Sequence, residues 1–374
     1  MSGCTERGKP LIAILMAVYE PRMDWLREQL ESLEKQTYPN LKLYVRDDCS
    51  RTVPFEEIEG CVRNCIRSFP YEIQRNEENL GSNRTFERLT EEAEGEYFAY
   101  CDQDDVWLPD KLTVLQEELE HTGALLACSD MVIIDGEGKQ TADSITKIRR
   151  HHRFQSGQGL AEGLLVSNFV TGCTMLVKGD AAKFAVPFCP YMVHDHYIAL
   201  CCSAAGEIYS VTRPLIRYRV HGKNQTGVMA GVTDRASYRR ERIDLPLYKF
   251  QWLEEHFPYR EEFQEEISLR REWMYARQSK VIYDKSLVCD ASTCIIWSKE
   301  NIAVVSKLQH RGIVRTFVDI IVKSIRNQRK LLLLNCFQPL RISIPILLQL
   351  PEFGICIIFL LHTVSFSKQL SMAG

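Results

Sequence analysis

Three carboxylates follow a stretch that predicts a buried strand. Residues 97–101 are apolar and rich in aromatic rings, and the next four residues include Asp102, Asp104 and Asp105. Aspartates this close raise one another's pKa values and are rarely buried without a partner. A divalent cation would offset this repulsion, because oxygen ligands suit Mg²⁺ or Mn²⁺, which complete their shells with water and phosphate oxygens. The alternative is that these aspartates cap the helix that begins near Trp107.

Two other groups of polar residues stand at the ends of predicted elements. Asp47 and Asp48 follow the strand-like sequence LKLYV, and Asp195 lies between two histidines just before an apolar helix. Open α/β sheets bind ligands outside the carboxyl ends of their strands. We therefore expect Asp47, Asp48 and the carboxylates after residue 101 to face one crevice.

The elements that must position these groups follow a strand, helix, strand order. Residues 11–18 are continuously apolar, which is typical of a strand covered on both faces. A helix is indicated by the apolar spacing of Trp25, Leu26, Leu30 and Leu33. A second strand covers residues 41–45, so the unit is βαβ with a right-handed crossover. This pattern predicts an α/β fold with a mostly parallel central sheet.

Further elements are less uniform. We expect residues 52–69 to be irregular, residues 71–75 to be a short strand and residues 84–93 to be a helix. A basic run over residues 149–153 indicates a solvated loop, with a clamp on an anionic acceptor as the less favoured alternative.

Composition excludes several classes of protein. The 374 residues carry a formal net charge of −3, so no nucleic-acid partner is implied. The 14 cysteines show no CxxC pair or regular spacing, which favours reduced thiols over a disulfide framework. The apolar run after the N-terminus is short and is followed by Tyr19, Glu20 and Pro21, so we expect no signal peptide and a cytoplasmic protein.

The last third of the chain changes character. Residues 235–286 are charged and aromatic at helical spacing, which predicts helices. Residues 301–374 contain nine Lys and Arg against two Asp and Glu, together with apolar runs that Pro345, Gln349, Pro351 and Glu352 interrupt. These runs are too short to span a bilayer. An interfacial membrane contact and a buried hydrophobic hairpin remain equal alternatives.

Several motifs in order resemble the family-two, GT-A-type inverting glycosyltransferases, especially their rhamnosyltransferase-like branch. From about Pro10 to Gly227 these motifs are ILMAVYEP, LYVRDDCS, the NLG turn, CDQDDVWLPDKL, VTGCTML, HDHYIAL and RYRVHGKNQTG. The resemblance implies a GT-A fold, Rossmann-like with a mostly parallel sheet, over residues 10–230. We expect a helical subdomain over residues 231–300 and the basic, apolar tail over residues 301–374.

The resemblance also implies a role for each matching residue. Ala17 and Tyr19 would lie against the nucleotide base, and Asp48 would hydrogen-bond it. Asp102 and Asp104 would be the DxD pair, with Asp104 as the ligand of Mg²⁺ or Mn²⁺ and Asp102 nearer the ribose.

On the acceptor side, the resemblance implies that Asp195 is the catalytic base. His221 would sit over the diphosphate and the metal, together with Arg219. Three positions depart from the family pattern: Glu20 stands where Asn is frequent, Cys49 where Gly is usual, and His194 where many members have an acidic residue.

The leading hypothesis is a metal-dependent glycosyltransferase of bacterial surface polysaccharide synthesis. Its donor would be dTDP-rhamnose or a UDP-hexose, its acceptor a glycan or lipid-linked hydroxyl, and its location the cytoplasm or the inner face of the plasma membrane. A nucleotidyltransferase is disfavoured because the first strand is not followed by a glycine-rich, basic phosphate loop. A noncatalytic sugar-nucleotide-binding or scaffolding protein is the remaining alternative.

Overall fold

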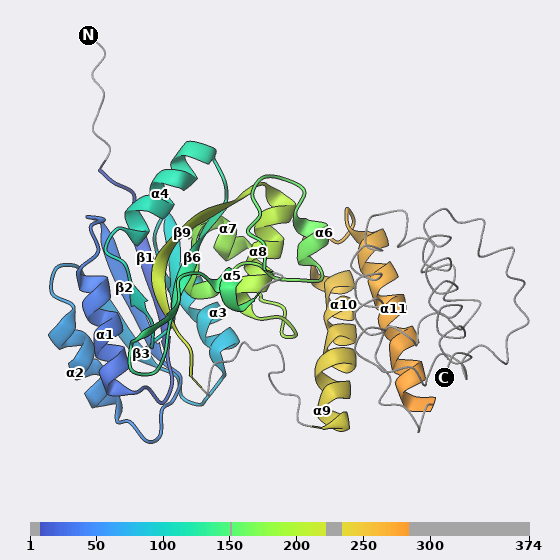
Figure 1. Ribbon diagram of the computed structural model, residues 1–374, viewed down its shortest axis with the longest axis horizontal. Coiled ribbons are helices and arrows are strands. Elements are labelled where there is room, and N and C mark those ends of the chain that lie inside the picture. The colour runs from blue at the N-terminus through green and yellow to red at the C-terminus, as the bar shows by residue number, and fades with distance from the viewer. Residues whose placement is uncertain (1–7, 150–151, 222–233, 284–374) are drawn as a thin grey trace, which may run out of the picture. The chain divides into compact units, whose positions relative to one another are not determined.

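A mixed nine-stranded sheet organises the computed structural model, which describes residues 8–149, 152–221 and 234–283 (Figure 1). Its strands follow the order β3-β2-β1-β4-β8-β6-β9-β5, and β7 pairs with β6. The first four are parallel to their neighbours: β3 (Tyr71–Arg75), β2 (Leu41–Asp47), β1 (Ile12–Val18) and β4 (Tyr97–Cys101). The predicted βαβ unit and the α/β fold are confirmed.

The second half of the sheet mixes strand directions: its long strands keep the direction of β4, and its shorter strands run against it. Strand β8 (Met175–Lys178) lies antiparallel between β4 and β6 (Leu126–Ile134). Strand β9 (Ile208–Arg219) runs parallel to β6, and the short β5 (Val106–Trp107) pairs antiparallel with β9. This last pairing places the carboxylates that precede Val106 beside the end of β9. Strand β7 (Gln140–Ala142) lies antiparallel to β6.

Helices cover both faces of the sheet, because successive strand residues point to opposite sides. Ile12, Ile14 and Met16 of β1 pack in the core with α1 (Met23–Glu34), α2 (Phe55–Cys65) and α4 (Lys111–Thr122). Ala13 and Leu15 share the other core with α3 (Ser82–Glu92), α6 (Ala161–Leu164), α7 (Gly179–Phe184) and α8 (His194–Ala205). Figure 1 shows α1 and α2 on one side of the strands and α3 and α8 on the other.

One expectation about this region was wrong. Residues 52–69, predicted to be irregular, contain helix α2, whose Ile58, Cys61 and Val62 are buried. Their spacing of three and four residues is that of one helical face, and the acidic first turn and the basic last turn suit the helix dipole. The short α5 (Ile145–Ile148) follows β7.

The predicted helices after residue 234 are present. They are α9 (Arg235–Arg239), a π-helical turn over Arg240–Asp244, α10 (Leu245–His256) and α11 (Gln264–Tyr283). Leu247, Phe250 and Leu253 belong to the same apolar core as α8. The Lys249 ammonium is buried and donates to the Leu165 carbonyl at 2.8 Å.

No helix among residues 8–149, 152–221 and 234–283 combines the length and apolar character needed to cross a bilayer. The tail over residues 301–374, and with it the expected membrane contact, lies outside the described residues. The boundary expected near residue 230 stays a prediction.

Candidate active site

The loops after β1, β2 and β4 meet at one edge of the sheet, because these three strands are parallel neighbours. Two hydrogen bonds join the first loop to the third: the Tyr19 amide donates to Gln103 Oε1 at 2.8 Å, and Gln103 Nε2 donates to the Tyr19 carbonyl at 3.0 Å. Tyr19 keeps an exposed ring, and Ala17 is half-buried in β1. The predicted carboxylate groups therefore do lie at the same edge.

Asp48 organises the loop that opens helix α3. One oxygen of its buried carboxylate accepts from Asn76 Nδ2 and the Leu80 amide, each at 2.8 Å, and the other accepts from the Gly81 amide at 2.8 Å. Gly81 has a φ of 80°, a conformation that glycine adopts without strain. If Asp48 also binds the nucleotide base, as expected, it must use oxygen lone pairs that these three donors do not occupy.

Two of the departures from the family pattern share a backbone conformation. Glu20 and Cys49 have φ values of 44° and 62°, in the left-handed region that Asn and Gly tolerate best. The Glu20 carboxylate offsets this by accepting from the Arg51 amide at 2.6 Å and the Thr52 amide at 3.1 Å. These bonds, above all that from the Thr52 hydroxyl, lower the pKa of Glu20. The backbone is thus left-handed at two residues, Glu20 and Cys49, that are less suited to this conformation than Asn and Gly.

We expect Cys49→Gly to stabilise the fold. The left-handed region costs a non-glycine residue roughly 1–2 kcal/mol. Glycine is more flexible in the unfolded chain, and this opposes the gain by roughly 0.5–1 kcal/mol. The net gain is about 0.5 kcal/mol, or about 1 °C in Tm. Cys65→Gly in helix α2 is the control, and it should lower Tm. A lower Tm for Cys49→Gly would contradict the assigned strain.

The carboxylates after β4 differ in exposure and partners. Asp104 is partly exposed, and its Oδ2 lies 2.6 Å from Nε2 of His221. Asp105 is fully buried, and its Oδ1 accepts from the Arg219 amide at 2.9 Å. Burial and the charges of Asp104 and Asp195 raise the pKa of Asp102 to about 7. None of the three caps α4: its N-cap residue is Asp110, whose side chain makes no capping bond, so that alternative was wrong.

Two sets of potential metal ligands result. The first is Asp104 with His221. The second is Asp102, Asp105 and Cys173, whose ligand atoms lie within 4.8 Å of one another. The second set is shielded, because Asp105 and Cys173 are buried and the buried Lys111 donates to the Cys173 carbonyl at 2.6 Å. A hard ion that also binds phosphate oxygens needs accessible oxygen ligands, which Asp104 and Asp102 provide.

Arg219 is placed as a support of this loop. Its guanidinium is almost fully buried and donates from Nε to the Asp104 carbonyl at 2.8 Å and from Nη2 to Glu28 at 2.5 Å. Its centre lies 5.1 Å from the Trp25 ring, which in turn lies 5.0 Å from the His221 ring. The expected contact of Arg219 with the diphosphate stays a prediction, and these contacts give the side chain a positioning role.

Asp195 lies in the first turn of α8 and is held by two donors. Asn168 Nδ2 donates to one oxygen at 3.1 Å and the Gly172 amide to the other at 2.9 Å. Burial raises the pKa of Asp195 to about 6, against the lowering effect of these hydrogen bonds. The negative charge of Asp195 also contributes to the raised pKa of Asp102.

A short turn connects Asp195 to the carboxylates after β4. In the 3₁₀ turn Gly172–Thr174, the Gly172 amide binds Asp195, and the next residue, Cys173, belongs to the cluster with Asp102 and Asp105. A Cβ on Gly172 would lie 2.7 Å from Nε2 of His194, so only glycine fits beside this histidine. The His194 ring packs on Phe86 at 4.2 Å between centroids, which assigns it to packing.

Four supporting residues were not identified from the sequence: Gln103, Lys111, Asn168 and Gly172. Gln103 is the variable middle residue of the DxD motif, so the motif gives it no role. Lys111 stands among polar residues at the start of a helix, where a lysine is normally exposed to solvent. The partners of Asn168 and Gly172 lie 27 and 23 residues away, so no local pattern points to them.

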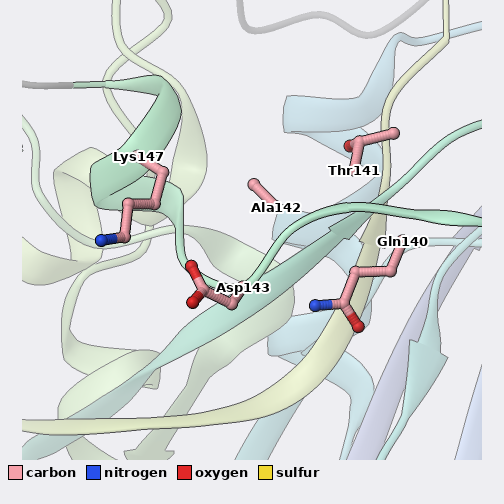
Figure 2. Close-up of a pocket in the computed structure, with 5 residues that line it drawn as sticks. All are labelled: Gln140, Thr141, Ala142, Asp143 and Lys147. Carbon is pink, nitrogen blue, oxygen red and sulfur yellow. The ribbon is translucent and has the colours of Figure 1, made fainter.

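A separate hollow lies along β7 and the start of α5 (Figure 2). Its walls are Gln140, Thr141, Ala142, Asp143 and Lys147, drawn as sticks in Figure 2. It contains none of the predicted site residues. The exposed side chains that line it leave it open to solvent, so we do not assign the candidate site there.

Comparisons with known proteins agree on one family. The profile of the family described as glycosyl transferase family 2 matches residues 13–183. A dTDP-rhamnosyl transferase of Shigella flexneri is 24% identical over 244 residues, 60% of this chain and 77% of that protein. An uncharacterized protein of Sinorhizobium fredii is 32% identical over 123 residues, and the match spans 32% of this chain and only 13% of that relative's length.

Among solved structures, a mannosyltransferase of Pyrobaculum calidifontis, in complex with GDP-Man and Mn²⁺, aligns over 86% of this chain and 88% of its own with a TM-score of 0.51. At 13% sequence identity this likeness concerns the fold, which is α/β and GT-A-like with a mixed central sheet and C-terminal helices.

Proposed function

Because residues 13–183 carry a domain of glycosyl transferase family 2, we propose that the chain is an inverting glycosyltransferase that moves a sugar from a nucleoside diphosphate to an acceptor hydroxyl. One observation carries the proposal. Asp104, paired with His221 in the loop after β4, and Asp195, on helix α8, belong to two carboxylate stations that the Gly172–Thr174 turn connects.

The reaction divides between these stations. Asp195 accepts the proton of the acceptor hydroxyl as that oxygen bonds to the anomeric carbon. The bond from this carbon to the diphosphate oxygen breaks, and its electron pair leaves with the nucleoside diphosphate. A single displacement from the opposite face inverts the anomeric centre. The donors Asn168 and Gly172 hold the base in place, which keeps the reacting atoms aligned.

The residues after β4 fit a divalent cation. Asp104 and His221 would hold Mg²⁺ or Mn²⁺, with Asp102 nearer the ribose, and the buried Asp105 supports the loop through the Arg219 amide. A bound cation would neutralise the negative charge that develops on the departing diphosphate. A protein of similar fold has been solved with GDP-Man and Mn²⁺, which is consistent with this part of the proposal.

The nucleotide would lie over the loops after β1 and β2. Ala17 and the exposed ring of Tyr19 would contact the base, with Asp48 below them. Gln103 ties Tyr19 to the metal loop, so base and diphosphate would be bound by one connected surface. The similarity to a dTDP-rhamnosyl transferase supports dTDP-rhamnose as the donor, and a UDP-hexose is the alternative. The acceptor would be a glycan or a lipid-linked hydroxyl of a bacterial surface polysaccharide.

A thermal-shift panel tests this proposal. The purified chain is mixed with UDP, dTDP or GDP, or with a sugar conjugate of one of them. Each mixture is measured with and without Mn²⁺. A ligand that binds only the folded state raises Tm. At a concentration of 100 times its Kd it adds about 2.7 kcal/mol to the free energy of unfolding. We expect a Mn²⁺-dependent shift with one nucleotide series. A folded chain that responds to none of them would contradict the proposal and favour a noncatalytic protein.

The transfer rate should also depend on pH. Asp195 must be deprotonated to accept a proton, and burial raises its pKa to about 6. The rate is therefore expected to be near its plateau above pH 7 and to fall to about one tenth of it at pH 5. Initial rates at saturating donor, with Tm measured at each pH, check this profile. A rate that does not change between pH 5 and 7 would exclude Asp195 as the base.

A further inference from the structure

A row of exposed tyrosines extends from the proposed base to the C-terminal helices. Tyr191 precedes α8, Tyr248 lies on α10 and Tyr275 on α11, and they are 41%, 43% and 42% exposed. Val193, two residues before Asp195, is 41% exposed. We call Val193, Tyr191, Tyr248 and Tyr275 the tyrosine row.

Contacts between side chains make this row continuous. The rings of Tyr191 and Tyr248 lie 5.6 Å apart at an angle of 47°. Gln251, one turn after Tyr248 on α10, donates to the Tyr275 hydroxyl at 2.6 Å. The segment just before α8 and the helices α10 and α11, which are far apart in the sequence, thus contribute to one surface.

The row is held firmly in place. The segment before Tyr191 is tied to α3, because the Phe188 amide donates to Glu87 at 2.5 Å and Asn83 Nδ2 donates to the Cys189 carbonyl at 3.3 Å. The residue after Tyr248, Lys249, is buried and bound to the Leu165 carbonyl. Aromatic rings that are fixed and still exposed suit ligand binding, since little side-chain freedom is lost on contact.

We propose that the tyrosine row binds a carbohydrate ring of the acceptor, an inference that rests on the proposed function. A sugar presents an apolar C–H face and a rim of hydroxyls, and a tyrosine presents an apolar ring and a polar hydroxyl. In the described part of the chain, the hydroxyls of Tyr191 and Tyr248 have no hydrogen-bond partner, so both can bind sugar hydroxyls. An acceptor whose hydroxyl reaches Asp195 would pass over Val193 and Tyr191.

The chemistry favours a sugar over two other occupants. An alkyl chain would leave the hydroxyls of Tyr191 and Tyr248 without partners. A stable protein partner buries about 800 Å² on each side, more than four side chains that are each about two-fifths exposed can supply.

Saturation-transfer NMR tests the inference. The probes are plain di- to tetrasaccharides of glucose, galactose, mannose and rhamnose, and vesicles of phosphatidylethanolamine and phosphatidylglycerol form a separate arm. We expect transfer to the C–H protons of at least one saccharide. Affinity should fall about fivefold in Tyr191→Ala and in Tyr248→Ala. It should fall less in Tyr191→Phe, which keeps the ring. Phe184→Ala, which removes an exposed ring outside the row, should have no effect.

Nucleotide-dependent Tm shifts of the same variants separate the two claims. If these shifts persist in every variant while saccharide binding falls only in the row variants, both claims are supported. Three results would contradict sugar binding by the tyrosine row when the nucleotides still shift Tm. The row variants bind saccharides normally, no saccharide binds the wild-type chain, or vesicles bind through the row. Failure of all nucleotides would instead count against the proposed function itself.

Discussion

Asp195→Asn is expected to stop sugar transfer and to leave donor binding almost unchanged. Loss of a general base costs about 10²- to 10⁴-fold in rate. Asp195 lies on α8 and is not among the residues proposed to hold the donor or the cation, so its removal takes no ligand from the donor. Its negative charge also raises the pKa of Asp102, and removing it makes Asp102 easier to ionise. Donor affinity should therefore stay within about twofold of wild type, which is about 0.4 kcal/mol.

The measurement pairs single-turnover transfer with donor titration by calorimetry. Asparagine brings a donor group to a position where Asn168 and the Gly172 amide both donate, and a mismatched buried hydrogen bond costs about 1–3 kcal/mol. A melting curve must therefore show that the variant is folded. Asp180→Asn, at an exposed aspartate in the first turn of α7, is the matched control and should keep full activity. Equal losses of transfer and donor affinity in Asp195→Asn would contradict the separation of base and donor site.

The parallel half of the fold could be predicted because its signals are local. The apolar run of β1 and the helical spacing in α1 each lie within about a dozen residues. The carboxylates follow directly from strand ends, so their common edge is a consequence of parallel order. Helix α2 also had a local signal, in Ile58, Cys61 and Val62, which was outweighed by its polar neighbours.

The mixed half of the sheet, from β8 to β5, could not be predicted in the same way. Strand β8 is inserted between β4 and β6, which precede it in the chain, and no residue pattern specifies such a partner. The β5–β9 pairing depends on residues about 110 positions apart. Because this pairing brings Arg219 and His221 to Asp105 and Asp104, the assembly of the metal loop emerges only in the folded chain.

The departures from the family pattern show what a sequence comparison can and cannot decide. Cys49 stands where Gly is usual and Glu20 where Asn is frequent, and both residues adopt the left-handed backbone that Gly and Asn favour. The usual residues would fit this backbone at least as well, so the effect of the two replacements is expected in stability. His194 replaces an acidic residue, and it fills the space between Phe86 and Gly172.

Asp104→Asn is expected to remove the Mn²⁺-dependent part of donor binding and to lower transfer by about 10²- to 10³-fold, since a cation at the diphosphate contributes several kcal/mol to the transition state. The change keeps the shape of the side chain beside His221, removes its charge and replaces one carboxylate oxygen with an amide nitrogen. The measurement is the Tm shift of a nucleoside diphosphate with and without Mn²⁺, followed by the transfer rate. Asp110→Asn is the matched control, because Asp110 forms an exposed ion pair with Arg213 that contributes little.

A second substitution decides between the two sets of ligands. If Asp104 and His221 hold the cation, Cys173→Ser should leave the Mn²⁺-dependent shift intact, because the Cys173 thiol is buried beside Lys111 and Asp105. If the cation instead binds the shielded cluster, Cys173→Ser should weaken Mn²⁺ and Asp104→Asn should not. That reversed pattern would move the metal away from Asp104. It would also leave the Asp104 and His221 pair as a contact that only shapes the loop, since Asp105 remains fixed to the Arg219 amide in either case.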